Sequence, residues 1–383
     1  AKPCDAVTVT EWFESHGMVD QVDGGAYISQ LVANTPSAAN ARAYAEIVRE
    51  KSILRQLIDV GAEITGGAFS SDGRDSRELL EEAERKVFAI ADQGQRTGSS
   101  FVSVQDTLKE AIDKIQELQE FEGEITGTPT GFKDFDNLTA GLQDSDLIIV
   151  AGRPAMGKTT LAMNMAENAA IKHEVPVAIF SMEMSALQLV MRLFSSLGQI
   201  DQTRLRTGNL DEMDWPKLTS AMNLLHKSKI FIDETPSLSP AELRARARRL
   251  KREHDIGMIV VDYLQLMAVP GSNENRATEI AEISRSLKAI AKELHVPVIA
   301  LSQLNRALEQ RPNKRPVMAD LRESGAIEQD ADLIVFIYRD EVYNDESPDK
   351  GKAEIIIGKH RNGPTDTVEL SFQGQWLRFV NYA

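Results

Sequence analysis

The stretch from residue 146 to residue 160, DLIIVAGRPAMGKTT, restricts the possible folds more than any other part of the sequence. An apolar run leads into G-x-x-x-x-G-K-T, whose glycines are Gly152 and Gly157, and a run of helical character follows. This order of strand, glycine-bounded loop and helix is typical of a phosphate-binding loop. The glycines allow successive backbone N–H groups to face one anion, and the helix N-terminus adds partial positive charge.

Each part of this loop has an expected role. Lys158 should reach the β- and γ-phosphates of a nucleotide, and the Thr159 hydroxyl should hold Mg²⁺. The predicted cofactor-binding residues are Gly152, Arg153, Pro154, Ala155, Met156, Gly157, Lys158, Thr159 and Thr160. The alternative is a glycine turn that binds nothing, and the flanking strand and helix argue against it.

Composition limits the remaining possibilities. A chain of 383 residues with 42% hydrophobic content is long enough for two or three domains with a real core. The single cysteine, Cys4, excludes a disulfide framework and a cysteine zinc site and fits a reducing cytoplasm. No apolar run approaches the roughly 20 residues that span a bilayer, and no signal peptide is visible, so we expect a cytoplasmic protein without a membrane segment.

Two further features concern charge and the start of the chain. The formal net charge of −15 argues against non-specific nucleic-acid binding by bulk charge, although a local basic channel remains compatible with it. The sequence starts at Ala1 without an initiator methionine, so we expect a fragment or a chain that lacks preceding residues.

Residues 1–97 carry no chemical signature and are predicted to be a helical N-terminal domain. Apolar residues at helical spacing predict one helix over about 38–64 and a second after Asp75, with the Gly- and Ser-rich loop GGAFSSDGRD between them. Such an αα-hairpin has few places to bury its apolar face, so we expect self-association or packing on a partner. An ordinary helical domain with its own core is the alternative.

Residues 98–123 are predicted to be a linker that contains one amphipathic helix. The preceding QGQRTGSS has linker composition. Apolar residues then recur at steps of three and four: Phe101, Val104, Leu108, Ile112, Ile115, Leu118 and Phe121. We expect this helix to dock either on its own domain or on a neighbouring subunit.

Residues 124–383 are predicted to form the nucleotide domain. Strands alternate with helices from about residue 132, which indicates a mainly parallel sheet covered by helices. Four apolar runs end in residues suited to phosphate chemistry: the phosphate loop, Glu183, Asp262 and Gln303. Because ligands bind at the carboxyl ends of parallel strands, these four endings should converge on one site.

The three strand-end residues have distinct expected roles. Asp262 should bind Mg²⁺ together with Thr159, because a carboxylate ending a buried strand is costly unless it is satisfied. Glu183 fits a general base for the attacking water, although flanking serines also allow it to be a helix N-cap neighbour. Gln303 fits a sensor of the γ-phosphate, or alternatively a polar strand end at the surface.

Six short segments of the sequence resemble those of a known family. The segments GRPAMGKTT, SMEMS, DYLQLM, LSQLNR, LRESGAIEQDAD and GKHRNGP occur in the order found in bacterial replicative DNA helicases of the DnaB type. The resemblance covers the whole chain and implies a RecA-like ATPase domain behind a partial all-α N-terminal domain and a linker helix. It implies that the hairpin is the C-terminal part of that N-terminal domain, without the globular helices that normally precede it.

The resemblance also implies an activity. Members are ring-shaped hexamers that hydrolyse ATP with Mg²⁺ at subunit interfaces, translocate 5′ to 3′ on single-stranded DNA and unwind the duplex at replication forks. Primase and a helicase loader are the implied protein partners. Two other functions share parts of the pattern: a filament-forming RecA-like recombination or repair ATPase, and a non-enzymatic scaffold that recruits other proteins.

The segment AEIIIGKHRNGPTDTVELSF reads as two strands around an Asn362-Gly363 turn, with Arg361 at the tip and Lys359 just before it. In the resembling family, matching Lys and Arg residues reach the γ-phosphate of the neighbouring subunit. Both are therefore candidate catalytic residues, and the alternative for Arg361 is an exposed turn arginine.

The expected DNA contacts are Arg322, Glu323 and Gly325, in a loop that follows the basic segment 306–316. The family places matching loops in the central channel, where Arg322 and backbone amides near Glu323 and Gly325 would hold phosphates. The Arg-rich helix after Ser239 is a rival, but its capping box favours a solvated covering helix.

Overall fold

The computed structural model describes residues 41–70, 104–120, 125–269, 275–321 and 325–382, and residues 11–13, 15–18, 30, 75, 76, 79, 82, 83, 86, 87 and 90. The chain divides into two compact units, Ala1–Gln116 and Glu117–Ala383. The boundaries predicted from linker composition, at residues 97 and 123, stay predictions. None of the described helices combines the length and apolar character that a membrane crossing requires.

Helix α3 (Ala41–Phe69) is longer than the sequence predicts. The sequence pattern places its end near Ile64, yet the helix continues through Gly66 and Gly67 into the predicted loop. Each glycine lowers helix stability by about 1 kcal/mol. Leu79 of the returning segment lies close to Gly67, since a Cβ added there would be in ordinary van der Waals contact with its Cδ2, at 3.8 Å.

The described residues near Lys86 lie beside α3, and the αα-hairpin stays a prediction. Lys86 forms ion pairs with Glu63 on α3 and with Glu82, at 2.8 and 2.9 Å. Because residue 86 lies beside residue 63 while residue 79 lies beside residue 67, the two segments run antiparallel. Several large apolar side chains of α3 stay exposed within this unit: Ile47, Val48, Leu54, Leu57 and Ile58.

The amphipathic helix is present as α5 (Val104–Glu120). Four members of its predicted apolar stripe are exposed: Val104, Leu108, Ile112 and Ile115. Phe101 and Phe121 lie outside the described residues. Docking of this helix stays a prediction.

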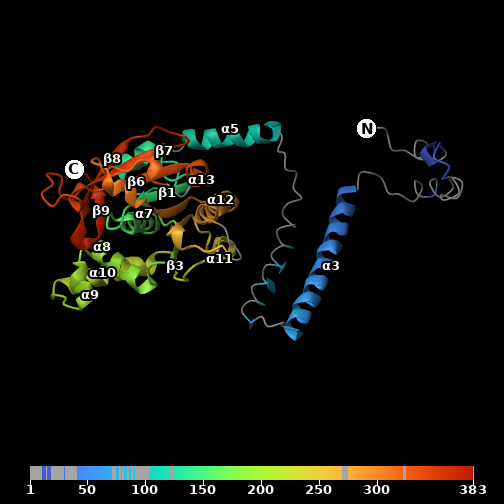
Figure 1. Ribbon diagram of the computed structural model, residues 1–383, viewed down its shortest axis with the longest axis horizontal. Coiled ribbons are helices and arrows are strands. Elements are labelled where there is room, and N and C mark those ends of the chain that lie inside the picture. Colours follow the sequence, from blue (N-terminus) through green and yellow to red (C-terminus); the bar gives the residue numbers. More distant parts are fainter. Residues whose placement is uncertain are drawn as a thin grey trace. The chain divides into compact units, whose positions relative to one another are not determined.

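Nine strands of the second unit form one sheet in the order β3-β2-β4-β5-β1-β6-β7-β8-β9. Figure 1 labels β1, β3 and β6 to β9 of this sheet. The strands are β1 (Leu147–Gly152), β2 (Val177–Ser181), β3 (Ile230–Asp233), β4 (Met258–Asp262), β5 (Val298–Gln303), β6 (Leu333–Tyr338), β7 (Lys352–His360), β8 (Thr367–Gln373) and β9 (Arg378–Asn381). Strands β1 to β6 pair in parallel, whereas β6 to β9 pair antiparallel. The predicted mainly parallel sheet and the predicted two-stranded segment at 353–372 are confirmed.

Helices cover both faces of this sheet, as expected from the alternation of side chains along each strand. Ile148 and Val150 of β1 belong to one core, shared with α6 (Lys133–Thr139), α7 (Lys158–Lys172) and α8 (Ala186–Gly198). Leu147 and Ile149 belong to the other, shared with α11 (Pro240–His254), α12 (Arg276–Leu294) and α13 (Gly325–Asp330). The helices α9 (Gln202–Thr207) and α10 (Asp214–Lys227) follow α8. Strand β1 is therefore buried on both sides.

The Arg-rich helix α11 is a covering helix, as its sequence predicts. Ser239 and Glu242 form the expected capping box. Leu243 and Ala247 are buried against the sheet. Arg246 pairs with Asp233 at 2.6 Å, and Arg244 and Arg248 both pair with Glu293 of α12. These arginines are neutralised within the domain.

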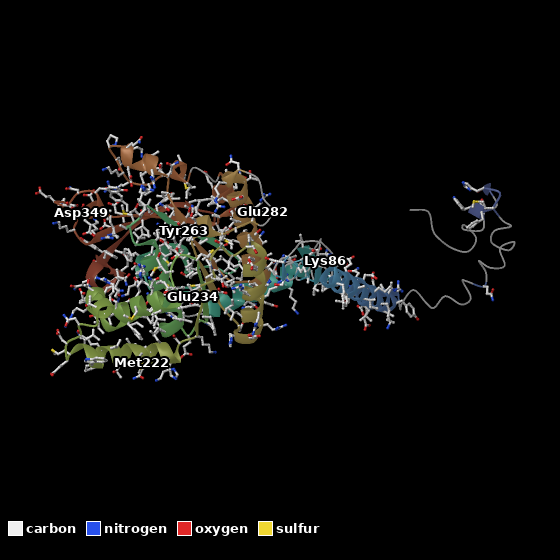
Figure 2. The ribbon with its side chains drawn as sticks, turned by 60° about the horizontal axis from the view of Figure 1, so that its bottom comes forward. Lys86, Met222, Glu234, Tyr263, Glu282 and Asp349 are labelled. Atoms are coloured by element: carbon white, nitrogen blue, oxygen red, sulfur yellow. The ribbon has the colours of Figure 1, made fainter. Side chains whose placement is uncertain are left out.

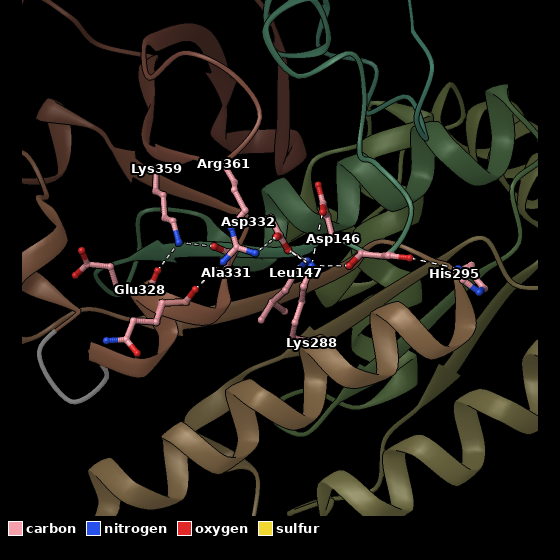
Figure 3. A network of polar contacts seen from close by, with 11 residues as sticks. Asp146, Leu147, Lys288, His295, Glu328, Ala331, Asp332, Lys359 and Arg361 are labelled. Atoms are coloured by element: carbon pink, nitrogen blue, oxygen red, sulfur yellow. Dashed lines mark hydrogen bonds and ion pairs between the residues drawn. The ribbon is translucent and has the colours of Figure 1, made fainter. Parts of the chain in front are cut away.

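A buried polar cluster lies at the amino end of β1 (Figure 3). Lys288 of α12 donates to the Ser145 carbonyl at 2.8 Å and pairs with the Asp332 carboxylate. Its Nζ also lies 3.7 Å from Asp146 Oδ1. Burial and the adjacent Asp332 carboxylate raise the pKa of the Asp146 carboxyl to about 6, despite the opposing effect of Lys288.

Replacing Asp146 by asparagine should change how stability depends on pH. The pKa of Asp146 rises from 3.8 to about 6 on folding. The native state therefore loses stability as pH rises from about 4 through 6. Asp146→Asn removes this loss, so urea unfolding should show the variant to be more stable than wild type at pH 7.5, with a smaller gap at pH 5. A difference in unfolding free energy that is the same at both pH values would contradict the raised pKa of Asp146.

Candidate phosphate-binding and catalytic site

A cavity of about 310 Å³ lies at the carboxyl ends of β1, β2, β4 and β5. It is lined by Pro154, Ala155, Gly157, Lys158, Thr159, Thr160, Glu183, Arg192, Tyr263, Gln303, Phe372 and Leu377. Tyr263 follows β4 and lies inside the outline of the domain, whereas Met222 of α10 lies at its margin (Figure 2). The four strand endings therefore converge as the sequence predicts.

The backbone of the loop is shaped for an anion. Gly157 is the N-cap residue of α7 and has φ 96°, a conformation that favours glycine. A Cβ added there would lie 3.0 Å from Cζ of Phe379. Helix α7 begins at Lys158, so its unpaired N–H groups and its dipole point toward the cavity.

The side chains of Arg153 and Met156, both in the phosphate loop, do not line the cavity. Arg153 is buried, donates to the Leu304 carbonyl at 2.7 Å and pairs with Glu309 at 2.8 Å. Met156 is buried in the core beside α7. Like Gly152, neither lines the cavity, so these residues would serve a bound phosphate through their backbone.

Asp262 ends β4 beside the loop and is 2% exposed. Its Oδ2 accepts a hydrogen bond from the Thr159 hydroxyl at 2.8 Å, and its buried Oδ1 has no hydrogen-bond partner among the described residues. Burial raises the pKa of this carboxyl to about 6, and the nearby Glu183 adds to the rise. An unpartnered carboxylate oxygen next to a hydroxyl is a donor set that suits Mg²⁺, a cation that prefers oxygen ligands.

Lys158 and Glu183 both line the cavity. Burial lowers the pKa of Lys158, while the charges of Asp262 and Glu183 raise it. Glu183 is exposed to the cavity. Glu183 lies two residues before Ser185, the N-cap of α8, and Ser185 and Gln188 form the capping box of that helix. The side chain of Glu183 is therefore placed where it can face a substrate in the cavity.

Gln303 lies at the end of β5, half-buried in the cavity wall. Its backbone N–H donates to Gln265 Oε1 at 3.3 Å, and the Gln265 amide donates to Ser302 Oγ at 3.1 Å. These bonds connect the strand end to the segment after β4. The position of Gln303 in the cavity wall fits a residue that faces a ligand. It fits less well with a polar strand end at the outer surface of the domain.

Arg192 of α8 lines the cavity and was missed by the sequence analysis. Burial lowers the pKa of its guanidinium, whereas the carboxylates of Asp262 and Glu183 raise it. It is the single charged residue in ALQLVMRLFSSLG, and a lone charge within an apolar helix was the available signal. Phe372 and Leu377 from the β8–β9 region were also missed, because no motif marks them.

Lys359 and Arg361 do not belong to this cavity. Lys359 lies near the end of β7 and Arg361 follows it, at the amino edge of the parallel strands where β1 starts. The six residues of β1 separate that edge from the phosphate loop. This is roughly 20 Å at about 3.3 Å per residue, so neither side chain reaches the cavity of its own chain.

The predicted DNA loop is described only in part. Gly325 is the exposed first residue of α13. Arg322 and Glu323 lie outside the described residues. In the preceding basic segment, Arg311 pairs with Asp320 and Arg315 pairs with Glu354. The DNA-binding roles stay predictions.

Comparison with known proteins places these features in one family. Residues 127–381 match the model of the DnaB-like helicase C terminal domain, and residues 1–50 match that of the DnaB-like helicase N terminal domain. The chain belongs to the DnaB-type replicative DNA helicases. It is 56% identical over 386 residues to the replicative DNA helicase DnaB of Haemophilus influenzae, an alignment that covers 100% of this chain and 82% of that protein.

More distant relatives agree. The replicative DNA helicase DnaB of Geobacillus stearothermophilus is 50% identical over 381 residues, covering 99% of this chain and 83% of that protein. A solved DnaB-like replicative helicase, described with its interactions with primase, superimposes with a TM-score of 0.77 at 33% identity and covers 98% and 87% of the two chains. A second solved structure, an isolated ATPase domain, gives a TM-score of 0.70 at 38% identity, covering 72% of this chain and 99% of that one.

Family membership decides between the functions that the sequence left open. The chain is an ATP-dependent replicative DNA helicase with a RecA-like ATPase domain. It is therefore an enzyme of DNA replication, neither a recombination ATPase nor a non-enzymatic scaffold.

Replacing Gly157 by alanine should impair nucleotide binding. The left-handed φ and the Cβ at 3.0 Å from Phe379 both oppose a side chain. We expect the free energy of unfolding to fall by about 1–2 kcal/mol. Nucleotide affinity, measured by titration with a fluorescent ATP analogue, should fall at least about tenfold as the N–H groups lose alignment.

Gly208→Ala is the matched control. Its φ of +72° imposes similar strain, but an added Cβ would meet no atom within 4 Å. Stability should fall by about 1 kcal/mol while nucleotide affinity stays at the wild-type value. Equal affinities for the Gly157 variant and wild type would contradict the role of the loop.

Proposed function

We propose that this chain forms a ring hexamer that hydrolyses Mg·ATP between adjacent subunits and moves 5′ to 3′ along single-stranded DNA, unwinding the duplex at replication forks. The observation that carries this proposal is the division of cationic groups over the two edges of one sheet. Lys158 and Arg192 lie at the carboxyl edge, whereas Lys359 and Arg361 lie at the amino edge. One chain cannot bring both pairs to one phosphate, but two adjacent chains can.

Within the cavity, the residues of one chain bind the triphosphate and activate water. Lys158 and the N-terminus of α7 contact the β- and γ-phosphates, and Arg192 supplies a second positive charge beside them. Glu183 accepts a proton from the attacking water, and Gln303 hydrogen-bonds the γ-phosphate. Thr159 and Asp262 would hold Mg²⁺, which supplies charge neutralisation for the phosphoryl oxygens.

The neighbouring chain completes the site. Arg361 and Lys359 from its β7 end stabilise the negative charge on the transferring phosphoryl group. An arginine supplied in trans accelerates such reactions by about 10³ to 10⁵. Hydrolysis would then depend on assembly, since a lone subunit lacks these cations.

The remaining contacts concern DNA and proteins. Arg322 and the backbone near Glu323 and Gly325 bind DNA phosphates in the channel, which explains indifference to base sequence. Primase is the first expected protein partner, because the DnaB-like relative of known structure is described with its primase interactions. A helicase loader is the second expected protein partner. The single cysteine of the chain fits a location in the reducing cytoplasm.

Three substitutions test the motor. Lys158→Ala should abolish ATP binding and unwinding. Glu183→Gln should retain ATP binding but lower kcat by about 10² to 10⁴, because the base is lost. Arg361→Ala should retain nucleotide binding and hexamer formation and lower kcat by about 10³ or more. DNA-dependent phosphate release, strand displacement and native mass measurements report these effects, and unwinding that persists in Lys158→Ala would end the proposal.

A further inference from the structure

The two cations at the amino edge are bound to the end of one short helix. Lys359 Nζ donates to the carbonyls of Glu328 and Ala331, at 2.5 and 2.7 Å. Arg361 Nη2 donates to the carbonyl of Gln329 at 2.8 Å. These carbonyls belong to the C-terminal turn of α13 and to the residue after it, where helix carbonyls lack partners and attract positive charge.

Asp332 joins these cations to the centre of the sheet (Figure 3). Its Oδ1 accepts from Arg361 Nη1 at 2.9 Å. Its Oδ2 accepts from the backbone N–H of Leu147 at 2.8 Å and from Lys288 Nζ. The backbone carbonyl of Asp332 accepts from the N–H of Arg361 at 2.8 Å. One carboxylate therefore connects the start of β1, α12 and the end of β7.

This arrangement holds Arg361 from one side only. The side chain of Asp332 is 5% exposed, whereas that of Arg361 is 47% exposed. Within the described residues, the guanidinium donates once through Nη1 and once through Nη2. An arginine has five N–H groups, so an outward-facing set stays available for an anion that arrives from outside the subunit.

We propose that Asp332 is a positioning residue for Arg361: it fixes the guanidinium in the orientation in which that group meets the ATP of the adjacent subunit. This inference rests on the proposed function, because it requires Arg361 to act in trans. Asp332 itself lies at the amino edge of the sheet, far from the phosphate cavity of its own chain. Its effect on catalysis therefore passes through Arg361.

Asp332→Asn tests this role while it preserves shape. The buried N–H of Leu147 and the ammonium of Lys288 are both donors, so the new amide oxygen turns toward them and its NH₂ group faces Arg361, which is also a donor. The guanidinium then loses its anchor. We expect the DNA-stimulated kcat to fall about tenfold or more, as for loss of a charge-assisted hydrogen bond, while KM for ATP stays within about twofold.

Asp146→Asn is the matched control. It neutralises a carboxylate that lies beside Lys288 and Asp332 in the same cluster, but it leaves the Asp332 carboxylate in place, and none of the described hydrogen bonds joins Asp146 to Arg361. Its kcat should equal that of wild type. If Asp332→Asn has no cooperative melting transition, Asp332→Glu is used in its place. Asp332→Glu keeps the negative charge but displaces the carboxylate by one methylene. Its kcat should again fall, while its KM for ATP stays unchanged.

Mixed rings separate positioning from a general structural defect. Asp332→Asn chains keep an intact phosphate loop, and Lys158→Ala chains keep an intact Arg361. Rings formed from both contain interfaces at which a working loop meets a well-placed arginine, so their ATPase rate should exceed that of either homogeneous ring. A rate no higher than that of the faster homogeneous ring would contradict positioning, as would equal kcat values for Asp332→Asn and Asp146→Asn.

A second mixture makes failure of the two proposals distinguishable. Arg361→Ala chains mixed with Lys158→Ala chains should recover activity if Arg361 acts in trans. No recovery in this mixture would overturn the trans role and the proposed function with it. Recovery here without recovery in the Asp332→Asn mixture would overturn the positioning role of Asp332 alone.

Discussion

The burial of β1 on both faces is the constraint on which the rest of the ATPase unit depends. A strand that exposes neither face must be apolar throughout, so polar chemistry can occur only where it starts and where it ends. Its carboxyl end delivers the phosphate loop, and its amino end is tied to Asp332 through the N–H and carbonyl of Leu147. The two sets of charged groups are thereby held a strand length apart by a rigid element.

Burial also explains the electrostatics at both ends. Asp262 and Asp146 each lie at an end of a buried strand, and the pKa of each carboxyl is raised to about 6 because water is excluded. Yet their surroundings differ. Asp262 has an oxygen without a partner among the described residues beside a hydroxyl, which is the condition of a group that awaits a ligand, whereas Asp146 lies within a cluster that Lys288 partly neutralises.

Much of this architecture could be predicted from the sequence, because the strands that carry the loop, Glu183, Asp262 and Gln303 are unbroken apolar runs with polar ends. The end of α3 was predicted too early, because helix propensity favoured a break at the glycines near residue 66, whereas the helix continues to Phe69. Arg192 escaped notice because its place in the cavity depends on how α8 lies across the sheet, which local spacing does not encode. The contacts of Asp332 could not be predicted for the same reason.

The antiparallel extension of the sheet has a mechanical consequence. Strands β7 and β8 are one continuous ribbon, with Phe372 in the wall of the chain's own cavity and Arg361 at the opposite tip. Arg339 lies over the Phe372 ring at 3.7 Å and donates to the carbonyl of Ala155 in the phosphate loop, so the ribbon is fastened to the nucleotide-binding loop. If Arg361 acts on the neighbouring subunit's ATP, as proposed, each ribbon would connect the nucleotide site of its own chain to that of the adjacent chain.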